Sequence, residues 1–179
     1  MLNLEDIKDE VVEEGYSELK SDRIDISWRL LTDGLMMYGY LYKRKWAGRI
    51  GYFINVHPCL KDVSVTGIRG GIAHECSHII KYTKHTRKEL FRDIRKYYQS
   101  QEYCRKEEIC TDIETINRGF GYDLLALEIF RERNYNHEVH TIPSSHLKEI
   151  LARMYDLPVE FMYKDYINLF ENGNGKKKR

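Results

Sequence analysis

The chain lacks the features of membrane, secreted and disulfide-bonded proteins. No apolar stretch approaches the roughly 20 residues that a membrane-spanning helix needs. The first residues, MLNLEDIKDEVVEEGY, are acidic, whereas a secretory signal is basic and then apolar. The four cysteines are Cys59, Cys76, Cys104 and Cys110. None of them forms a C-x-x-C pair, which favours free thiols. These absences predict a soluble cytoplasmic protein without a membrane partner.

The chain also lacks an excess of charge of either sign. It has 29 Lys and Arg residues against 28 Asp and Glu residues, a formal net charge of +1. Proteins dedicated to nucleic acids or membrane surfaces usually carry a clear basic excess. The balance therefore argues against a nucleic-acid partner, and it leaves the oligomeric state open. A length of 179 residues suits one domain with its own core.

Hydrophobic spacing predicts an α+β fold in the first third of the chain. Apolar residues recur at helical spacing over residues 4–19, which indicates an amphipathic helix. Three strand-like runs follow, separated by TDG and WAG: RIDISWRLL, LMMYGYLYK and RIGYFINV. We expect a small antiparallel or mixed three-stranded sheet, most simply an antiparallel meander, packed on the helices that follow.

The rest of the chain is predicted to be helical. One helix is expected from about Thr66 to Lys84. Two further helical segments, RKELFRDIRKYYQSQ and EYCRKEEICTDIETIN, end at the glycines of NRGFG, because glycine tolerates a left-handed helix end. YDLLALEIFRER, SSHLKEILARMY and VEFMYKDYINLF are also expected to be helical. The chain is thus predicted to form one domain over 1–172, helical over about 143–172, with a disordered basic tail at 173–179.

The segment IAHECSHII contains the pattern H-E-x-x-H on a predicted helix. His74 and His78 lie one turn apart and can share a zinc ion, while Glu75 can take a proton from the metal-bound water. Both histidines lie nearly opposite the apolar stripe of this helix, so we expect them to face a cleft. Gly70 and Gly71 precede them by one turn and indicate the close approach of another backbone.

A catalytic zinc needs a third protein ligand and an open position for water. His85 and Glu89, the latter with Asp93 one turn later, are two candidates. Glu108 is the best candidate, because it shares a helical face with Asp112, which can orient a histidine by accepting its second ring N–H. The interpretation favours Glu108 and leaves the other two open.

At these residues the chain resembles a family. HECSH followed by EICTD is similar to the H-E-x-x-H plus E-x-x-x-D pattern of gluzincin zinc peptidases, especially the compact minigluzincins. The resemblance implies that His74, His78 and Glu108 bind Zn²⁺. It also implies that Glu75 is the general base and that Asp112 lies behind the ligands. A zinc-dependent metallopeptidase acting on a peptide or protein substrate is therefore the expected function.

In such peptidases the strand before the zinc helix is an edge strand that pairs with an extended substrate. The residues that correspond here are Tyr52, Phe53, Ile54 and Asn55. An ordinary sheet strand is the alternative interpretation of the same run. An ordinary strand would have no role in substrate binding.

Two other functions compete with a peptidase. SSHLKEILARMYDLPVEFMYKDY has the rhythm of a helix-turn-helix, so a DNA-binding or protein-interacting regulator with a metallopeptidase-like domain is one alternative. Glu160 and Asp165 on its second helix would, however, repel a phosphate backbone. A zinc-stabilised interaction protein is the other, but a purely structural site does not need Glu75 beside its ligand.

Overall fold

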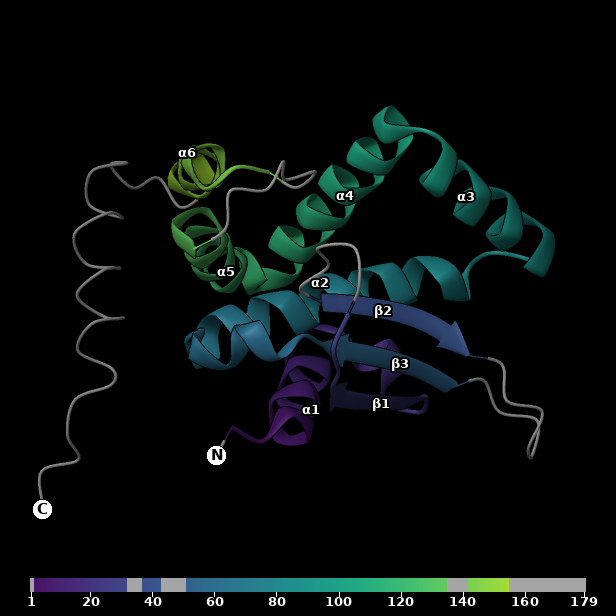
Figure 1. Ribbon diagram of the computed structural model, residues 1–179, viewed down its shortest axis with the longest axis horizontal. Helices are drawn as coiled ribbons and strands as arrows, with labels where there is room; N and C mark the ends of the chain where they lie inside the picture. Colours follow the sequence, from purple (N-terminus) through teal and green to yellow (C-terminus); the bar gives the residue numbers. More distant parts are fainter. Residues whose placement is uncertain (1, 32–36, 43–50, 135–141, 155–179) are drawn as a thin grey trace, which may run out of the picture.

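The computed structural model describes residues 2–31, 37–42, 51–134 and 142–154 (Figure 1). Its strands are β1 (Arg23–Trp28), β2 (Met37–Tyr42) and β3 (Gly51–Val56). Its α-helices are α1 (Leu4–Gly15), α2 (Val65–Thr83), α3 (Arg87–Gln99), α4 (Gln101–Thr115), α5 (Gly121–Asn134) and α6 (Ser144–Met154). The α+β class is confirmed. No helix in the described ranges combines the length and the apolar character needed to cross a membrane.

The predicted helices agree with the observed ones to within a few residues. The two segments after α2 are separate helices, because Ser100 has extended backbone dihedrals and ends one helix while capping the next. Gly119 has φ +97° in the short turn Ile116–Phe120, so the helix end expected at NRGFG is confirmed. The expected helix VEFMYKDYINLF and the tail 173–179 lie outside the described residues.

The sheet is mixed, and the expected antiparallel meander is wrong. Its order is β1–β3–β2, with β3 parallel to β1 and antiparallel to β2. β3 is the central strand, and its residues Tyr52, Ile54 and Val56 are at most 1% exposed. The proposed substrate strand at 52–55 is therefore not an edge strand, because both of its sides are occupied by neighbouring strands.

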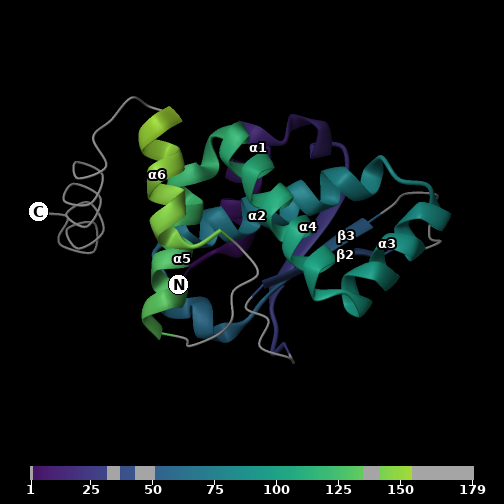
Figure 2. The same ribbon diagram turned by 90° about the horizontal axis from the view of Figure 1, so that it is seen from above.

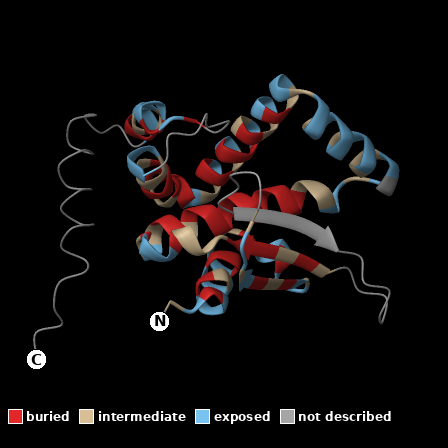
Figure 3. Ribbon diagram, viewed as in Figure 1, coloured by how far each residue is buried: buried red, intermediate tan, exposed pale blue. Residues whose placement is uncertain are grey.

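Helix α2 is the centre of the fold. It packs against α1, α4, α5 and the sheet, and every residue from Gly70 to Ile80 is buried (Figures 1 and 3). One face of α2 meets the main apolar core, which α1 and the sheet complete. Its histidine face is also buried, because α4 covers it. A second, smaller apolar cluster joins α5 to α6, which lie side by side in Figure 2.

The expected close backbone approach occurs at Gly70. A Cβ atom there would lie 2.3 Å from the carbonyl carbon and oxygen of Asp123 and 2.5 Å from the nitrogen of Leu124. Gly70 thus contacts backbone atoms of α5, and these cannot rotate away as a side chain can. Gly70 therefore fixes how closely α5 approaches the helix that carries the two histidines.

We expect Gly70→Ala to lower the free energy of unfolding by about 1–3 kcal/mol, because overpacking outweighs the higher helix propensity of alanine. Gly67→Ala is the matched control in the same helix. Its Cβ would meet Cγ1 of Val63 at 2.5 Å, a side-chain atom that can move, and the backbone nitrogen of Leu127 on α5 only at 3.3 Å, so the loss should be smaller. Urea unfolding of both variants measures the difference. Equal losses would show that the α2–α5 contact is not rigid.

Candidate metal site

Two histidines on α2 form the first part of the site. Their rings are 4.9 Å apart between centroids, and each residue is 8% exposed. His74 Nδ1 lies 2.8 Å from Oδ1 of Asp112, and His78 Nδ1 lies 3.3 Å from Oγ1 of Thr111. Asp112 and Thr111 both lie on α4, and each contacts the Nδ1 atom of its histidine.

These contacts fix which ring nitrogen of each histidine is available. A carboxylate oxygen only accepts, so Asp112 requires an N–H at Nδ1 of His74. The Thr111 hydroxyl donates its hydrogen to the carbonyl of Glu107 at 2.9 Å, and therefore accepts from Nδ1 of His78. Both histidines are thus assigned with hydrogen on Nδ1, so Nε2 of each ring can bind a metal once it carries no hydrogen.

Glu108 on α4 completes a group of three possible metal ligands. Its Oε2 lies 3.1 Å from Nε2 of His74, and its Oε1 lies 3.4 Å from Nε2 of His78. One ligand atom from each of the three residues lies within 4.8 Å of the others. The three side chains therefore converge and could hold a metal ion.

The electrostatics of the group favour a cation between the ring nitrogens and the carboxylate. Burial raises the pKa of Glu108, but hydrogen bonds from His74 and His78 outweigh it and hold that pKa well below its usual range. Burial lowers the pKa of His74, but hydrogen bonds to Asp112 and Glu108 raise it well above its usual value. A proton and a metal ion therefore compete for Nε2 of His74.

Asp112 supports the site with both carboxylate oxygens and is fully buried. Oδ1 accepts from His74, and Oδ2 accepts the backbone N–H of Ile142 at 2.8 Å. Ile142 lies two residues before α6, so the carboxylate connects the site to the segment that leads into that helix. The role expected for Asp112, orienting a histidine from behind, matches this geometry.

The structure places the two competing third ligands elsewhere. Glu89 caps α3, where its Oε2 accepts from the backbone nitrogen of Thr86 at 2.8 Å. His85 pairs with Asp93, with 3.3 Å between Nδ1 and Oδ2. Neither belongs to the group of converging ligand atoms.

Sequence reasoning missed Tyr97, which comes from α3. Its hydroxyl donates to Oε1 of Glu108 at 2.6 Å. Burial, the negative charge of Glu108 and the thiol of Cys104 raise the pKa of Tyr97 far above its usual value, so the hydroxyl keeps its proton. A tyrosine in a strongly charged helix gives no signal for this contact in the sequence.

The donor set fits zinc. Two imidazole nitrogens and one carboxylate oxygen are the ligands of a zinc site with an open position, and Glu75, 6% exposed, follows the first histidine on the same helix. Comparison of the chain with known protein families, curated proteins and solved structures found no match.

We expect Glu108→Gln, incubated with zinc, to retain much less of it than the wild type, because the neutral amide is a poor ligand between two imidazoles. Glu107→Gln is the matched control, since Glu107 is the adjacent residue and pairs with Lys81 instead. Metal content after dialysis measures the difference between the two variants. Full zinc occupancy in Glu108→Gln would exclude this carboxylate as a ligand.

Asp112→Asn should bind zinc about 10 to 100-fold more weakly, the usual cost of losing a partner behind a histidine ligand. It should also lower the free energy of unfolding by about 1–3 kcal/mol, because the amide can no longer accept from both His74 and Ile142. Glu114→Gln removes the same charge from α4 at a residue that pairs with Arg118. Zinc titration should separate the two variants, and identical affinities would remove Asp112 from the site.

Proposed function

We propose that the protein is a zinc-dependent metallopeptidase of gluzincin type. The observation that carries this proposal is the convergence of His74, His78 and Glu108 from two helices, with Glu75 beside the first histidine. The agreement between these positions and the H-E-x-x-H plus E-x-x-x-D pattern supports it. A coincidental pair of histidines would not require a buried carboxylate on a neighbouring helix to meet both rings.

A zinc ion at this site would acidify a water molecule and polarise a substrate carbonyl group. The residues of the chain then supply the proton transfers. Glu75 takes the proton of the attacking water and passes it to the leaving amine nitrogen. Asp112 keeps His74 in the orientation that presents Nε2. The reaction is the hydrolysis of a peptide bond.

The edge of the sheet offers a binding mode for an extended substrate. Among the described strands, β2 has a single neighbour, β3, and it is also the strand that packs most closely on α2 (Figure 1). An extended peptide could add to the outer side of β2 through backbone hydrogen bonds. β2 thus takes the place of residues 52–55 as the proposed substrate-binding strand. The peptide would still bind by adding a strand to the sheet.

The competing functions have less support. A purely structural zinc site is normally closed by four protein ligands, whereas three converge among the residues that the structure describes, and a carboxylate follows the first of them. For a helix-turn-helix regulator, only the first of the two helices, α6, is described. Leu147 and Leu151 of α6 are fully buried against α5, as expected for a helix that belongs to the domain core.

Glu75→Gln should keep the fold and the zinc and abolish peptide hydrolysis, because an amide preserves the shape of the side chain but cannot accept the proton. The test is digestion of a broad peptide library at neutral pH by the zinc-loaded full chain. Glu107→Gln, the same change on α4, should cleave like the wild type. Wild-type cleavage by Glu75→Gln would end its assignment as general base. A zinc-loaded wild type that cleaves no peptide would favour the interaction or regulatory alternatives.

A further inference from the structure

The two carboxylate oxygens of Glu108 have different surroundings. Oε1 accepts the Tyr97 hydroxyl at 2.6 Å, a length typical of a charge-assisted O–H···O bond. Oε2 faces Nε2 of His74 at 3.1 Å, and the longer contact with Nε2 of His78, 3.4 Å, is made by Oε1. The carboxylate is therefore held at one oxygen by α3 and presented at the other to a histidine of α2.

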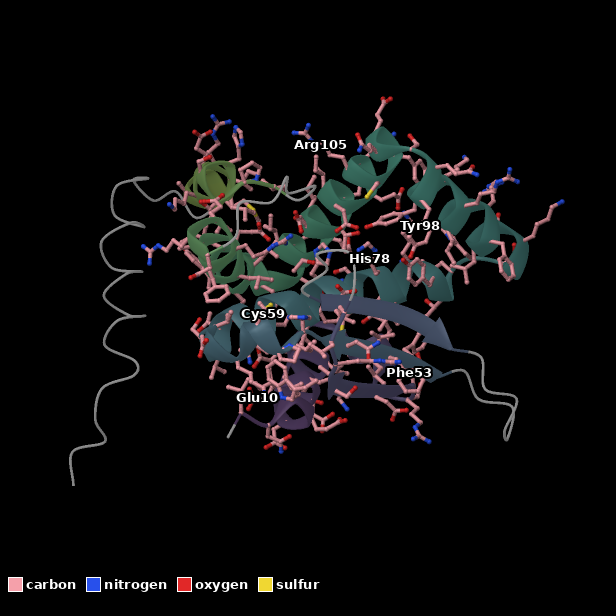
Figure 4. The ribbon with its side chains drawn as sticks, viewed as in Figure 1. Glu10, Phe53, Cys59, His78, Tyr98 and Arg105 are labelled. Carbon is pink, nitrogen blue, oxygen red and sulfur yellow. The ribbon has the colours of Figure 1, made fainter. Side chains whose placement is uncertain are left out.

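The backbone places Tyr97 rigidly. Helices α3 and α4 are joined by the single residue Ser100, whose N–H donates to the carbonyl of Lys96 at 2.9 Å. Its hydroxyl accepts from the nitrogen of Tyr103 at 3.2 Å, which caps α4. Figure 4 labels the neighbouring Tyr98, which is 71% exposed. The hydroxyl thus comes from a helix that leads directly into the helix of Glu108.

A carboxylate ligand that is free to rotate can bind a metal through one oxygen or both. A donor that occupies one oxygen limits this freedom, and partners of this kind tune both the affinity and the geometry of a metal site. The alternative is that Tyr97 only satisfies a buried acid and contributes to folding alone. In the first role, loss of the Tyr97 hydroxyl changes the affinity and the geometry of a bound metal. In the second role, it changes only the stability of the fold.

We propose that Tyr97 is a positioning residue of the metal site: its hydroxyl holds Oε1 of Glu108 and leaves Oε2 for the metal. This inference rests on the metal site of the proposed function, and it does not depend on the peptidase reaction. Tyr97 touches neither the metal nor a substrate and acts through Glu108.

The test compares Tyr97→Phe with Tyr98→Phe in the full chain. Each variant loses one hydroxyl and keeps its ring; the two rings are in edge contact at 5.8 Å, and Tyr98 is 71% exposed. Zinc affinity is measured by competition with a chromophoric chelator, and the ligand geometry by the visible absorption of the cobalt(II)-loaded protein. Thermal unfolding of the chelator-treated variants reports the fold separately.

Tyr97→Phe should bind zinc about 10 to 100-fold more weakly and change the cobalt spectrum, whereas Tyr98→Phe should match the wild type. Wild-type affinity and spectrum in Tyr97→Phe would overturn the inference. An equal loss in Tyr98→Phe would also overturn it, since the loss would then not be specific to the hydroxyl that contacts Glu108.

A second variant keeps the inference testable if Tyr97→Phe does not fold. Tyr97→3-fluorotyrosine retains the shape and the hydroxyl and makes that hydroxyl a stronger acid. Its cobalt spectrum should shift, and an unchanged spectrum would contradict the inference. A wild-type chain that binds no zinc would instead refute the metal site itself, so the two failures are distinguishable.

Discussion

The structure depends on a buried polar contact between α2 and α4. Glu108 and Asp112, one turn apart on α4, both meet His74, and Asp112 is completely removed from solvent. Two buried carboxylates place negative charge in a medium that solvates it poorly, so they need a positive partner. Asp112 and Glu108 raise the pKa of His74 well above its usual value, so a proton on its ring is one such partner, and a metal ion bound at Nε2 is the other. The buried charge of this helix pair therefore requires a cation at this position, which either that proton or a metal supplies.

A second polar network holds the same two helices in register behind the site. The Tyr16 hydroxyl, from the chain just after α1, donates to the carbonyl of Ala73 at 2.6 Å and lies 2.8 Å from Oγ of Ser77. Ser77 in turn contacts the hydroxyl of Thr115 on α4 at 3.0 Å. Ala73 precedes His74 and Ser77 precedes His78, so the contacts that position α1 also fix the backbone beside both histidines. Burial raises the pKa of Tyr16 well above its usual value, and its hydroxyl remains a donor.

Local signals in the sequence predicted the helices and the candidate ligands, because both follow from spacing along one element. Helical periodicity gave α2 to within one residue, and the i, i+4 pairs His74/His78 and Glu108/Asp112 follow from the same period. The order of the strands depends instead on which strands pair with each other, and this is a tertiary property. The contact of Asp112 with Ile142 joins residues 30 positions apart and has no local signature. Tyr97 was missed because nothing in a strongly charged helix distinguishes one tyrosine from the next.

The partners behind the three candidate ligands argue that the group is a built site. His74 is held by Asp112, His78 by Thr111 and Glu108 by Tyr97, so each ligand has its own hydrogen-bond partner. Two of these partners lie on α4 and the third on α3, whereas both histidines lie on α2. A chance pair of histidines on a helix has no reason to acquire matched supports from two other helices. Ligands whose second contacts are fixed in this way are pre-organised for a metal, because little freedom is left to lose on binding.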